Sequence, residues 1–271
     1  MTPAPPVLPA FTQITRAAAG REWLSHRLNR FLHAHLALVL AAGLLPLLTP
    51  GDALARGAAW WLLHAVLYAV SLSALLLGLS SAQAETDEFP WLLAQPAGIG
   101  PWLAGKAAML ALLAAVSAGL LALPTALAGA GSPELLLTTA GAAGVSSVCA
   151  LTGLATGFWI RDSVRGLIVA MATWLVILFG ADLLLLALAG APFMQNHPDL
   201  WVLPLMLNPL DAFRITVLFA AERAAFSGIE AGRLTGWWVT HAAGWLATLT
   251  AAWSALALVA AWLGARRQLD G

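Results

Sequence analysis

Apolar residues occur along the chain in six stretches of about 20 residues, separated by short connections that carry most of the charges. At the rise of an α-helix, about 20 residues match the roughly 30 Å hydrocarbon core of a bilayer. Backbone groups in lipid must form hydrogen bonds within their own segment, and a β-barrel would show shorter alternating runs instead. The pattern therefore predicts an all-α membrane protein with six transmembrane helices, over residues 32–49, 58–82, 107–129, 135–160, 167–190 and 237–264.

Composition indicates that lipid is the solvent of most of the chain. Hydrophobic residues make up 61% of the sequence and charged residues only 10%, whereas about a quarter of the residues in a soluble domain are charged. The formal net charge is zero and no block of basic residues occurs, so nucleic-acid binding has no support. Transport, intramembrane catalysis and scaffolding remain as classes of function.

Lys and Arg residues are distributed unequally between the two sides of the predicted helices. On the side of the termini lie nine: Arg16, Arg21, Arg27, Arg30, Lys106, Arg161, Arg165, Arg266 and Arg267. On the other side lie four: Arg56, Arg214, Arg223 and Arg233. Because cytoplasmic loops carry the excess of positive charge, we expect both termini in the cytoplasm, with residues 265–271 as a short tail.

Residues 1–31 form a leader before the first predicted span, and the transmembrane domain then covers residues 32–264. The leader is Pro-rich up to residue 10, and its later apolar residues recur at roughly helical spacing: Phe11, Ile14, Ala18, Leu24, Leu28 and Phe31. Its polar residues Arg16, His26, Arg27 and Arg30 fall mainly on the opposite side. We expect an amphipathic helix along the cytoplasmic interface, with a solvated basic leader as the alternative.

The cytoplasmic connection 83–106 contains an acidic cluster, Glu85, Asp87 and Glu88, followed by a short apolar piece and several Pro and Gly residues. It is too polar to cross the membrane and too apolar for a free loop. We expect it either to bind a protein partner or to lie flat on the lipid. Lys106 then marks the start of the third span, where we expect its ammonium to reach the headgroups.

Two near-matches to functional motifs are read as coincidences. Gly100–Ala107 approaches a phosphate-binding P-loop, but Ala107 replaces the Ser or Thr that holds magnesium, and no strand precedes it. The chain therefore has no nucleotide site of its own. Ser146 and His241 suggest the dyad of rhomboid intramembrane proteases, but Ser147 stands where those proteases carry Gly.

The fourth predicted span is rich in small residues. Gly153 and Gly157 form a small-xxx-small pair, which permits close helix approach either within one chain or between two. Cys149, the single cysteine, lies in the same span, so no internal disulfide is possible and a role as a small core residue is expected.

The outer segment 191–236 is the only long connection, and it contains a good helix start at Asn208-Pro209-Leu210-Asp211. Asn208 can cap the helix, Pro209 suits its first turn, and Asp211 is favoured near its N-terminus. Leu210, Phe213, Val217, Ala221 and Ala224 then form an apolar stripe. We expect a helix on the outer interface or a re-entrant element, and no seventh span.

Asp182 is the one carboxylate well inside a predicted span. An ionisable group in lipid marks a substrate path by default, and pairing with Arg214 or with a backbone group is the structural alternative. Met194, His197 and Met206 in the outer segment carry soft ligands that suit Cu(I), but their spacing is irregular and ordinary loop packing is the better interpretation.

Four features resemble the membrane subunits, or permeases, of ABC-2-type ABC transporters. One is the plan of six spans with both ends in the cytoplasm. The others are three motifs: Pro96–Lys106 with its Pro and Gly-Lys pattern, Ala181–Leu188 with Asp182 before an apolar run, and Leu207–Arg214 with an Asn-Pro-x-Asp-x-aromatic-Arg element. Within this class the chain is most similar to the NosY permeases of NosDFY transporters, which support maturation of nitrous oxide reductase. The family usually has Gly-Thr-Leu shortly after an acidic residue in the first cytoplasmic loop; Glu85 fits the acid, but Asp87, Glu88 and Phe89 follow it.

The resemblance implies an ABC-2 fold of the type V exporter kind, and a homodimer in the bacterial inner membrane. Two separate NosF-like ATPase subunits would bind ATP and Mg and dock on the cytoplasmic side, so this chain would bind no cofactor and would not itself be an enzyme. The ATPase-coupling residues implied are Glu85, Asp87, Glu88, Phe89, Trp91, Leu92 and Gln95. A periplasmic NosD-like protein would contact Asn208, Pro209, Asp211 and Arg214.

The expected function is movement of a sulfur or copper species for the copper sites of the reductase. Export of a lipid, haem or drug by another ABC-2 permease is the alternative within the class. An intramembrane serine protease is the alternative from another class.

Overall fold

The computed structural model describes residues 11–48, 52–84, 98–197, 201–221 and 233–268. Within these ranges all regular structure is helical, as the sequence predicts. In chain order the helices are α1 (Phe11–His26), α2 (Arg30–Leu44), η1 (Leu45–Leu48), α3 (Asp52–His64), η2 (Ala65–Val70), α4 (Ser71–Gln83), α6 (Ile99–Thr125), η3 (Ala126–Ala130), α7 (Pro133–Trp159), α8 (Ser163–Leu188), α9 (Pro192–Asn196), α10 (Val202–Leu207), α11 (Pro209–Ala221) and α13 (Arg233–Arg267).

Six helical stretches in the described residues are long and apolar enough to cross a membrane, and the chain is a multi-pass membrane protein. They are Arg30–Leu48, Gly57–Gln83, Ile99–Ala130, Pro133–Trp159, Ser163–Leu188 and Gly236–Arg267. Each overlaps one predicted span. The third differs most, because its helix begins at Ile99 and not at residue 107. Residues 99–107 are therefore helical, and the P-loop-like sequence forms no loop.

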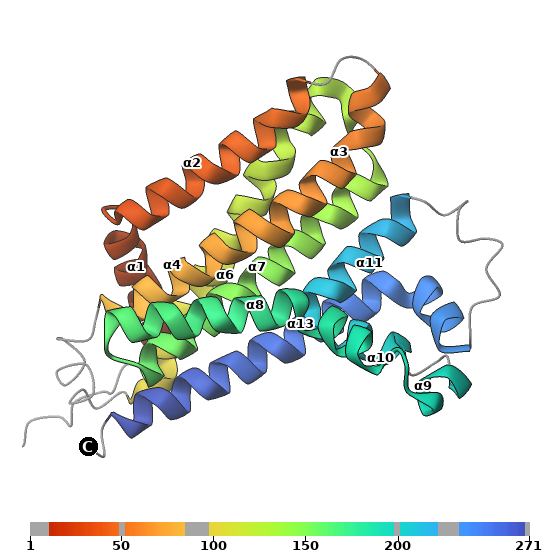
Figure 1. Ribbon diagram of the computed structural model, residues 1–271. Coiled ribbons are helices and arrows are strands. Elements are labelled where there is room, and N and C mark those ends of the chain that lie inside the picture. Colours follow the sequence, from red (N-terminus) through yellow and green to blue (C-terminus); the bar gives the residue numbers. More distant parts are fainter. Residues whose placement is uncertain (1–10, 49–51, 85–97, 198–200, 222–232, 269–271) are drawn as a thin grey trace, which may run out of the picture.

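Helix α7 is central to the bundle and contacts α4, α6, α8, α11 and α13 (Figure 1). Its closest neighbour is α4, which runs parallel to it. A Cβ atom on Gly153 would overlap the carbonyl oxygen of Leu75, and one on Gly78 would overlap that of Ala150. The small-xxx-small pair Gly153 and Gly157 therefore serves contact within the chain, since Gly157 also faces α4.

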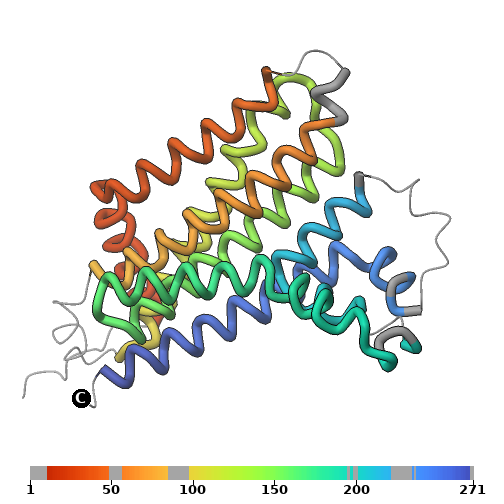
Figure 2. The backbone as a smooth tube through the Cα atoms, in the orientation of Figure 1, coloured from red at the N-terminus to blue at the C-terminus, as the bar shows by residue number. Residues whose placement is uncertain are grey.

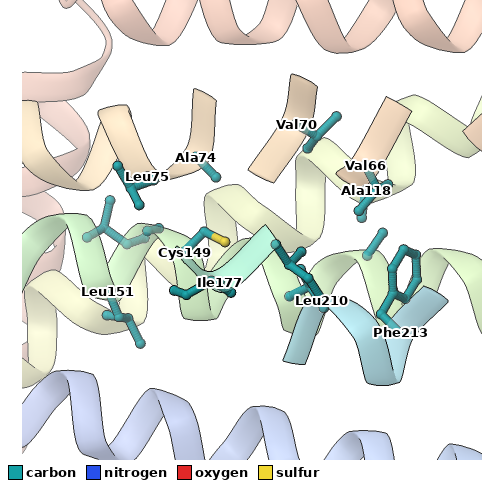
Figure 3. Packing of buried hydrophobic residues seen from close by; sticks show 14 of the residues in the cluster. Val66, Val70, Ala74, Leu75, Ala118, Cys149, Leu151, Ile177, Leu210 and Phe213 are labelled. Carbon is teal, nitrogen blue, oxygen red and sulfur yellow. The ribbon is translucent and has the colours of Figure 1, made fainter. Parts of the chain in front are cut away.

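The core of the bundle lies between α4, α7 and their neighbours (Figure 3). Cys149 is 1% exposed there, as expected of a small core residue. Ile177 of α8 and Leu210 and Phe213 of α11 reach the same cluster. By contrast α8 is poorly covered: 22% of its most apolar stretch is buried, against 67% in Gly57–Gln83. Most of the surface of α8 is therefore left for lipid or for a partner.

The predicted interfacial helix is present as α1, but it is docked on the bundle through a side that carries Glu22 and His26. Arg16, Arg27 and Arg30 of the predicted polar side are exposed, as expected. The apolar residues Phe11, Trp23 and Leu24 are 47–58% exposed, so they can face the membrane interface. His26, which we expected on the solvent side, is 1% exposed. The helix ends at His26, and α2 begins at Arg30, where the Phe31 backbone N–H donates to the Asn29 side chain.

Lys106 corrects a second expectation from the sequence. Its side chain does not reach out to headgroups, because it is 1% exposed and donates to the carboxylate of Glu22 on α1.

The tube trace in Figure 2 shows α1 at the same end of the bundle as the last turns of α13. The six candidate spans among the described residues are an even number, which agrees with this common end for α1 and the last turns of α13.

The described residues of the outer segment include helices α9, α10 and α11, at the opposite end of the bundle (Figure 1). Helix α11 contacts α3, α7, α8 and α13 and does not lie on the surface of the bundle. Its predicted stripe is buried: Leu210, Phe213 and Val217 are at most 2% exposed. Ala224 lies outside the described residues. Helix α11 has 13 described residues, which is too short to span a bilayer, and the described ranges contain no seventh candidate span.

Candidate functional site

Asp182 on α8 and Arg214 on α11 form a salt bridge with two parallel hydrogen bonds. Arg214 Nη1 donates to Asp182 Oδ2 at 3.0 Å, and Nη2 donates to Oδ1 at 2.9 Å. This fork geometry is the strong form of the arginine–carboxylate contact. The pairing that the sequence offered as the structural alternative for Asp182 is therefore formed, across 32 positions of the chain.

Asn208 explains why the two side chains meet. Its side-chain oxygen accepts from the Leu210 backbone N–H at 3.0 Å, which caps the start of α11. Its side-chain amide donates to the backbone carbonyl of Ile177 on α8. One residue thus fixes the first turn of α11 against α8. Pro209 occupies the first helical position, and Arg214 then lies little more than one turn further on, facing Asp182.

Asp211 is the third member of this group, one turn before Arg214 on α11. Arg214 Nη2 lies 2.9 Å from Asp211 Oδ1, whereas Asp211 Oδ2 is buried without a hydrogen-bond partner. Burial raises the pKa of Asp211 to about 6, because the opposing effect of Arg214 is too small to offset it and the nearby Asp182 adds to the shift. We call Asp182, Asp211 and Arg214 the Asp182 cluster.

The Asp182 cluster is open on one side. The side chains of Arg214 and Asp182 are 31% and 43% exposed, although Asp182 lies six residues before the end of α8, or about 9 Å along its axis. With both carboxylates ionised the cluster carries a net charge of −1. An exposed ion pair at this depth is costly against lipid, so protein or water must cover it.

Three aromatic rings form a row along span Gly57–Gln83. Trp60, His64 and Tyr68 stack in sequence, with ring centroids 6.1 Å apart at each step. Trp60 is 38% exposed and Tyr68 is 47% exposed. The hydrogen bonds that Arg214 donates to Asp182 raise the pKa of Arg214, and Tyr68 is near enough to add to this effect. Tyr68, at one end of the row, is therefore the member near Arg214.

Tyr68 belongs to the π-helix η2, which interrupts the regular α-helical turn of this span. Such single-turn π segments often mark functional sites. The aromatic row was missed from the sequence, although Trp60, His64 and Tyr68 recur at intervals of four residues, the spacing of one helix face.

The other residues singled out from the sequence are dispersed. Glu85, Asp87, Glu88, Phe89, Trp91, Leu92 and Gln95 lie outside the described residues. Met206 is buried and its backbone carbonyl accepts from the Trp245 indole at 2.9 Å, whereas His197 is exposed; the side chain of Met194 is not described. In the described part of the chain no three His, Cys, Asp or Glu side chains gather as a metal site.

Ser146 and His241 do not form a dyad. Ser146 Oγ is buried and has no hydrogen-bond partner, and His241 Nδ1 bonds within its own helix, 2.9 Å from the Trp237 carbonyl. A nucleophilic serine needs the base within hydrogen-bond reach.

Comparison with models of known protein families and with curated proteins produced no match for this chain. The case for a function therefore depends on residues and their geometry.

Proposed function

We propose that the chain is the membrane subunit of an ABC transporter, an ABC-2-type permease that depends on a separate ATPase subunit. The general support is the six-span helical plan together with the helical conformation of residues 99–107, which offers no P-loop within this stretch. The transmembrane helices would convert movements driven by the partner into the opening of a path.

One observation carries this proposal further than composition can. Two of the three motifs that carry the resemblance lie far apart in sequence, and they meet in one salt bridge. Asp182 comes from the motif in the fifth span, and Arg214 ends the Asn-Pro motif of the outer segment. Asn208, the first residue of the Asn-Pro pair, holds α11 against α8 through the Ile177 carbonyl. The two motifs thus form one contact between α8 and α11, as expected if the resemblance has a structural basis.

The charge distribution supports an orientation with both termini in the cytoplasm of a bacterial inner membrane. Burial of Lys106 removes one of the nine positive charges from that side, and eight against four still favours the same orientation. On this proposal the Asp182 cluster lies in the outer half of the membrane, and α1 lies at the cytoplasmic end.

A homodimer with a path between the subunits would account for the open face. Asp182 and Arg214 of the Asp182 cluster and the Trp60, His64 and Tyr68 row are at least partly exposed in the single chain, where lipid would be an unfavourable neighbour. A second copy across an aqueous path would provide the missing polar surroundings. A NosY-like role with a sulfur or copper species remains the specific form of the proposal; export of a lipid, haem or drug is the alternative.

Affinity purification of the full chain from its native membrane in mild detergent tests the proposal. We expect an ATPase subunit to co-purify in equal amount with this chain, and a periplasmic NosD-like protein to accompany it if the NosY-like form holds. Recovery of the chain without any ATPase, together with turnover of a substrate by the chain alone, would overturn the proposal.

A charge-reversal variant sharpens this test. Glu85, Asp87 and Glu88 changed together to Lys should reduce ATPase recovery, because the resemblance assigns the docking surface to them. The matched control is Arg161→Glu, which reverses an exposed charge at the same end of the bundle. Equal recovery from both variants would remove the docking role from these three acids.

A further inference from the structure

A second group of charges is buried at the α1 end of the bundle. Glu22, His26, Ser81 and Lys106, which we call the α1 cluster, are each at most 3% exposed. Lys106 Nζ donates to Glu22 Oε2 at 2.5 Å, Ser81 Oγ donates to Glu22 Oε1, and His26 Nε2 lies 2.8 Å from the same Oε1. One carboxylate therefore collects contacts from three side chains.

The cluster joins three separate helices. Glu22 and His26 are one turn apart on α1, Ser81 lies two residues before the end of α4, and Lys106 lies in the second turn of α6. Lys106 also lies 5.7 Å from the centre of the Trp102 ring, one turn earlier on α6. Through Glu22, helix α1 therefore links the end of α4 to the start of α6.

The backbones of α1 and α6 lie close together beside the α1 cluster. A Cβ atom on Gly105, the neighbour of Lys106, would stand 2.7 Å from the Ala18 Cβ and 2.9 Å from the Ala19 backbone nitrogen. Small residues on both helices therefore let α1 cross α6 at a short distance. Among the helices, α6 makes the most extensive contact with α1.

Apolar contact alone would hold α1 on the bundle without defining its position along α6. A buried carboxylate and ammonium define that position, because a shift of one turn would leave each charge buried without its partner. Burial raises the pKa of Glu22, but the contacts from His26 and Lys106 outweigh it and lower the value to about 2, so the carboxylate stays ionised at physiological pH. Helix α1 accordingly has one docked position.

From this geometry we propose that Glu22 is a positioning residue that locks α1 to the ends of α4 and α6, so that α1 moves with these two helices as one body. The functional part of this inference rests on the proposed function, since it gives α1 a part in passing movements between the partner ATPase and the spans. A helix that merely floated on the interface would need no buried charge cluster.

Cysteine labelling of the full chain in detergent tests the lock. Cys149 is the only native cysteine and is 1% exposed, so background labelling is low. Ala18→Cys should react about tenfold more slowly with maleimide than Gln13→Cys on the exposed side of α1, because it faces α6. Adding Glu22→Gln should remove most of that protection, whereas adding Arg27→Gln, an exposed charge just after the same helix, should not.

Protection that survives Glu22→Gln would overturn the lock. Should Glu22→Gln fail to give a monodisperse protein, Ser81→Ala, which removes one hydrogen bond from the same carboxylate, should show a smaller loss of protection. Unchanged labelling in that variant would count against the lock as well.

ATPase coupling separates a positioning role from a purely structural one. In the purified complex, Glu22→Gln should leave ATPase binding intact and reduce the stimulation of ATP hydrolysis by the permease. Full stimulation in a variant that has lost protection would overturn the positioning role. If the wild-type chain recruits no ATPase, the proposed function fails, and the labelling result still decides whether Glu22 locks α1.

Discussion

The two ion-pair clusters differ in how completely the protein surrounds them. In the α1 cluster Glu22 and Lys106 balance each other, and neither is more than 3% exposed. In the Asp182 cluster two carboxylates share one guanidinium, the Arg214 and Asp182 side chains are 31% and 43% exposed, and Asp211 Oδ2 lacks a hydrogen bond. A closed and balanced cluster defines a position. A partly exposed cluster with unbalanced charge is suited to contact water or a second copy of the chain.

The largest expected effect comes from breaking the closed cluster. Lys106→Met leaves the Glu22 carboxylate buried without its counter-charge, and the loss of one partner of a buried pair costs about 3–5 kcal/mol. We expect a clear fall in the thermal unfolding temperature in mild detergent, measured by tryptophan fluorescence. The double variant Glu22→Gln with Lys106→Met should regain most of the loss, because no uncompensated charge remains.

Arg161→Met is the matched control for that experiment, since it removes an exposed positive charge from the same end. It should change the free energy of unfolding by less than about 0.5 kcal/mol. A Lys106→Met protein as stable as this control would show that the α1 cluster is not closed to water, and the contrast between the clusters would lose its basis.

The same kind of change in the open cluster should cost less. Arg214→Met leaves Asp182 and Asp211 facing each other, but water can reach the exposed side and screen them, so we expect a loss of about 1–2 kcal/mol in the free energy of unfolding. Asp182→Asn added to Arg214→Met should reduce the loss. A cost equal to that of Lys106→Met would mean that the Asp182 cluster is as closed as the α1 cluster.

The dependence of stability on pH should have opposite signs in the two clusters. Asp211 has a folded pKa of about 6, above its ordinary value of 3.8, so its contribution to stability is present below pH 3.8 and is lost as pH rises to about 6. The free energy of unfolding of Asp211→Asn should therefore rise by about 1–2 kcal/mol relative to that of the wild type between pH 4 and pH 7. Thermal unfolding of both proteins across this range measures the gain.

Glu22 supplies the opposite case. Its folded pKa of about 2 lies below the ordinary 4.5, so its contribution is present above pH 4.5 and is lost as pH falls toward 2. The wild type should be more stable than Glu22→Gln above pH 4.5, and this difference in the free energy of unfolding should shrink as the pH falls toward 2. Parallel pH profiles for the Asp211→Asn and Glu22→Gln differences would contradict the distinction drawn between the clusters.

The sequence was sufficient for the features whose cause is local. Span length and hydropathy predicted all six spans, because a helix in lipid must be long and apolar whatever it packs against. The Asn208-Pro209 start of α11 was predicted for a similar reason, since capping depends on the residues of one turn. Asp182 with Arg214 could be offered as a pair because a carboxylate inside a span needs a partner.

The features that escaped prediction depend on contacts between distant segments. Glu22 and Lys106 are 84 positions apart, and a lysine at the edge of a span has the same local pattern whether it reaches the headgroups or a buried carboxylate. The burial of His26 escaped prediction for the same reason: periodicity shows that a helix has two sides, and only the partner decides which residues of it are buried.

The smallest expected effect concerns the residue that brings the open cluster together. Asn208→Ala removes the cap of α11 and the contact with the Ile177 carbonyl, and loss of an N-cap costs about 1 kcal/mol. Because α11 would then be free to shift against α8, the double-mutant coupling energy between Asp182→Asn and Arg214→Met should fall when it is measured in the Asn208→Ala background. The corresponding coupling between Glu22→Gln and Lys106→Met should stay constant, since α1 makes no extensive contact with α11 in the described residues. A coupling energy for Asp182 and Arg214 that is indifferent to Asn208 would show that burial of Leu210 and Phe213 alone positions α11, and the Asn-Pro motif would then need another explanation.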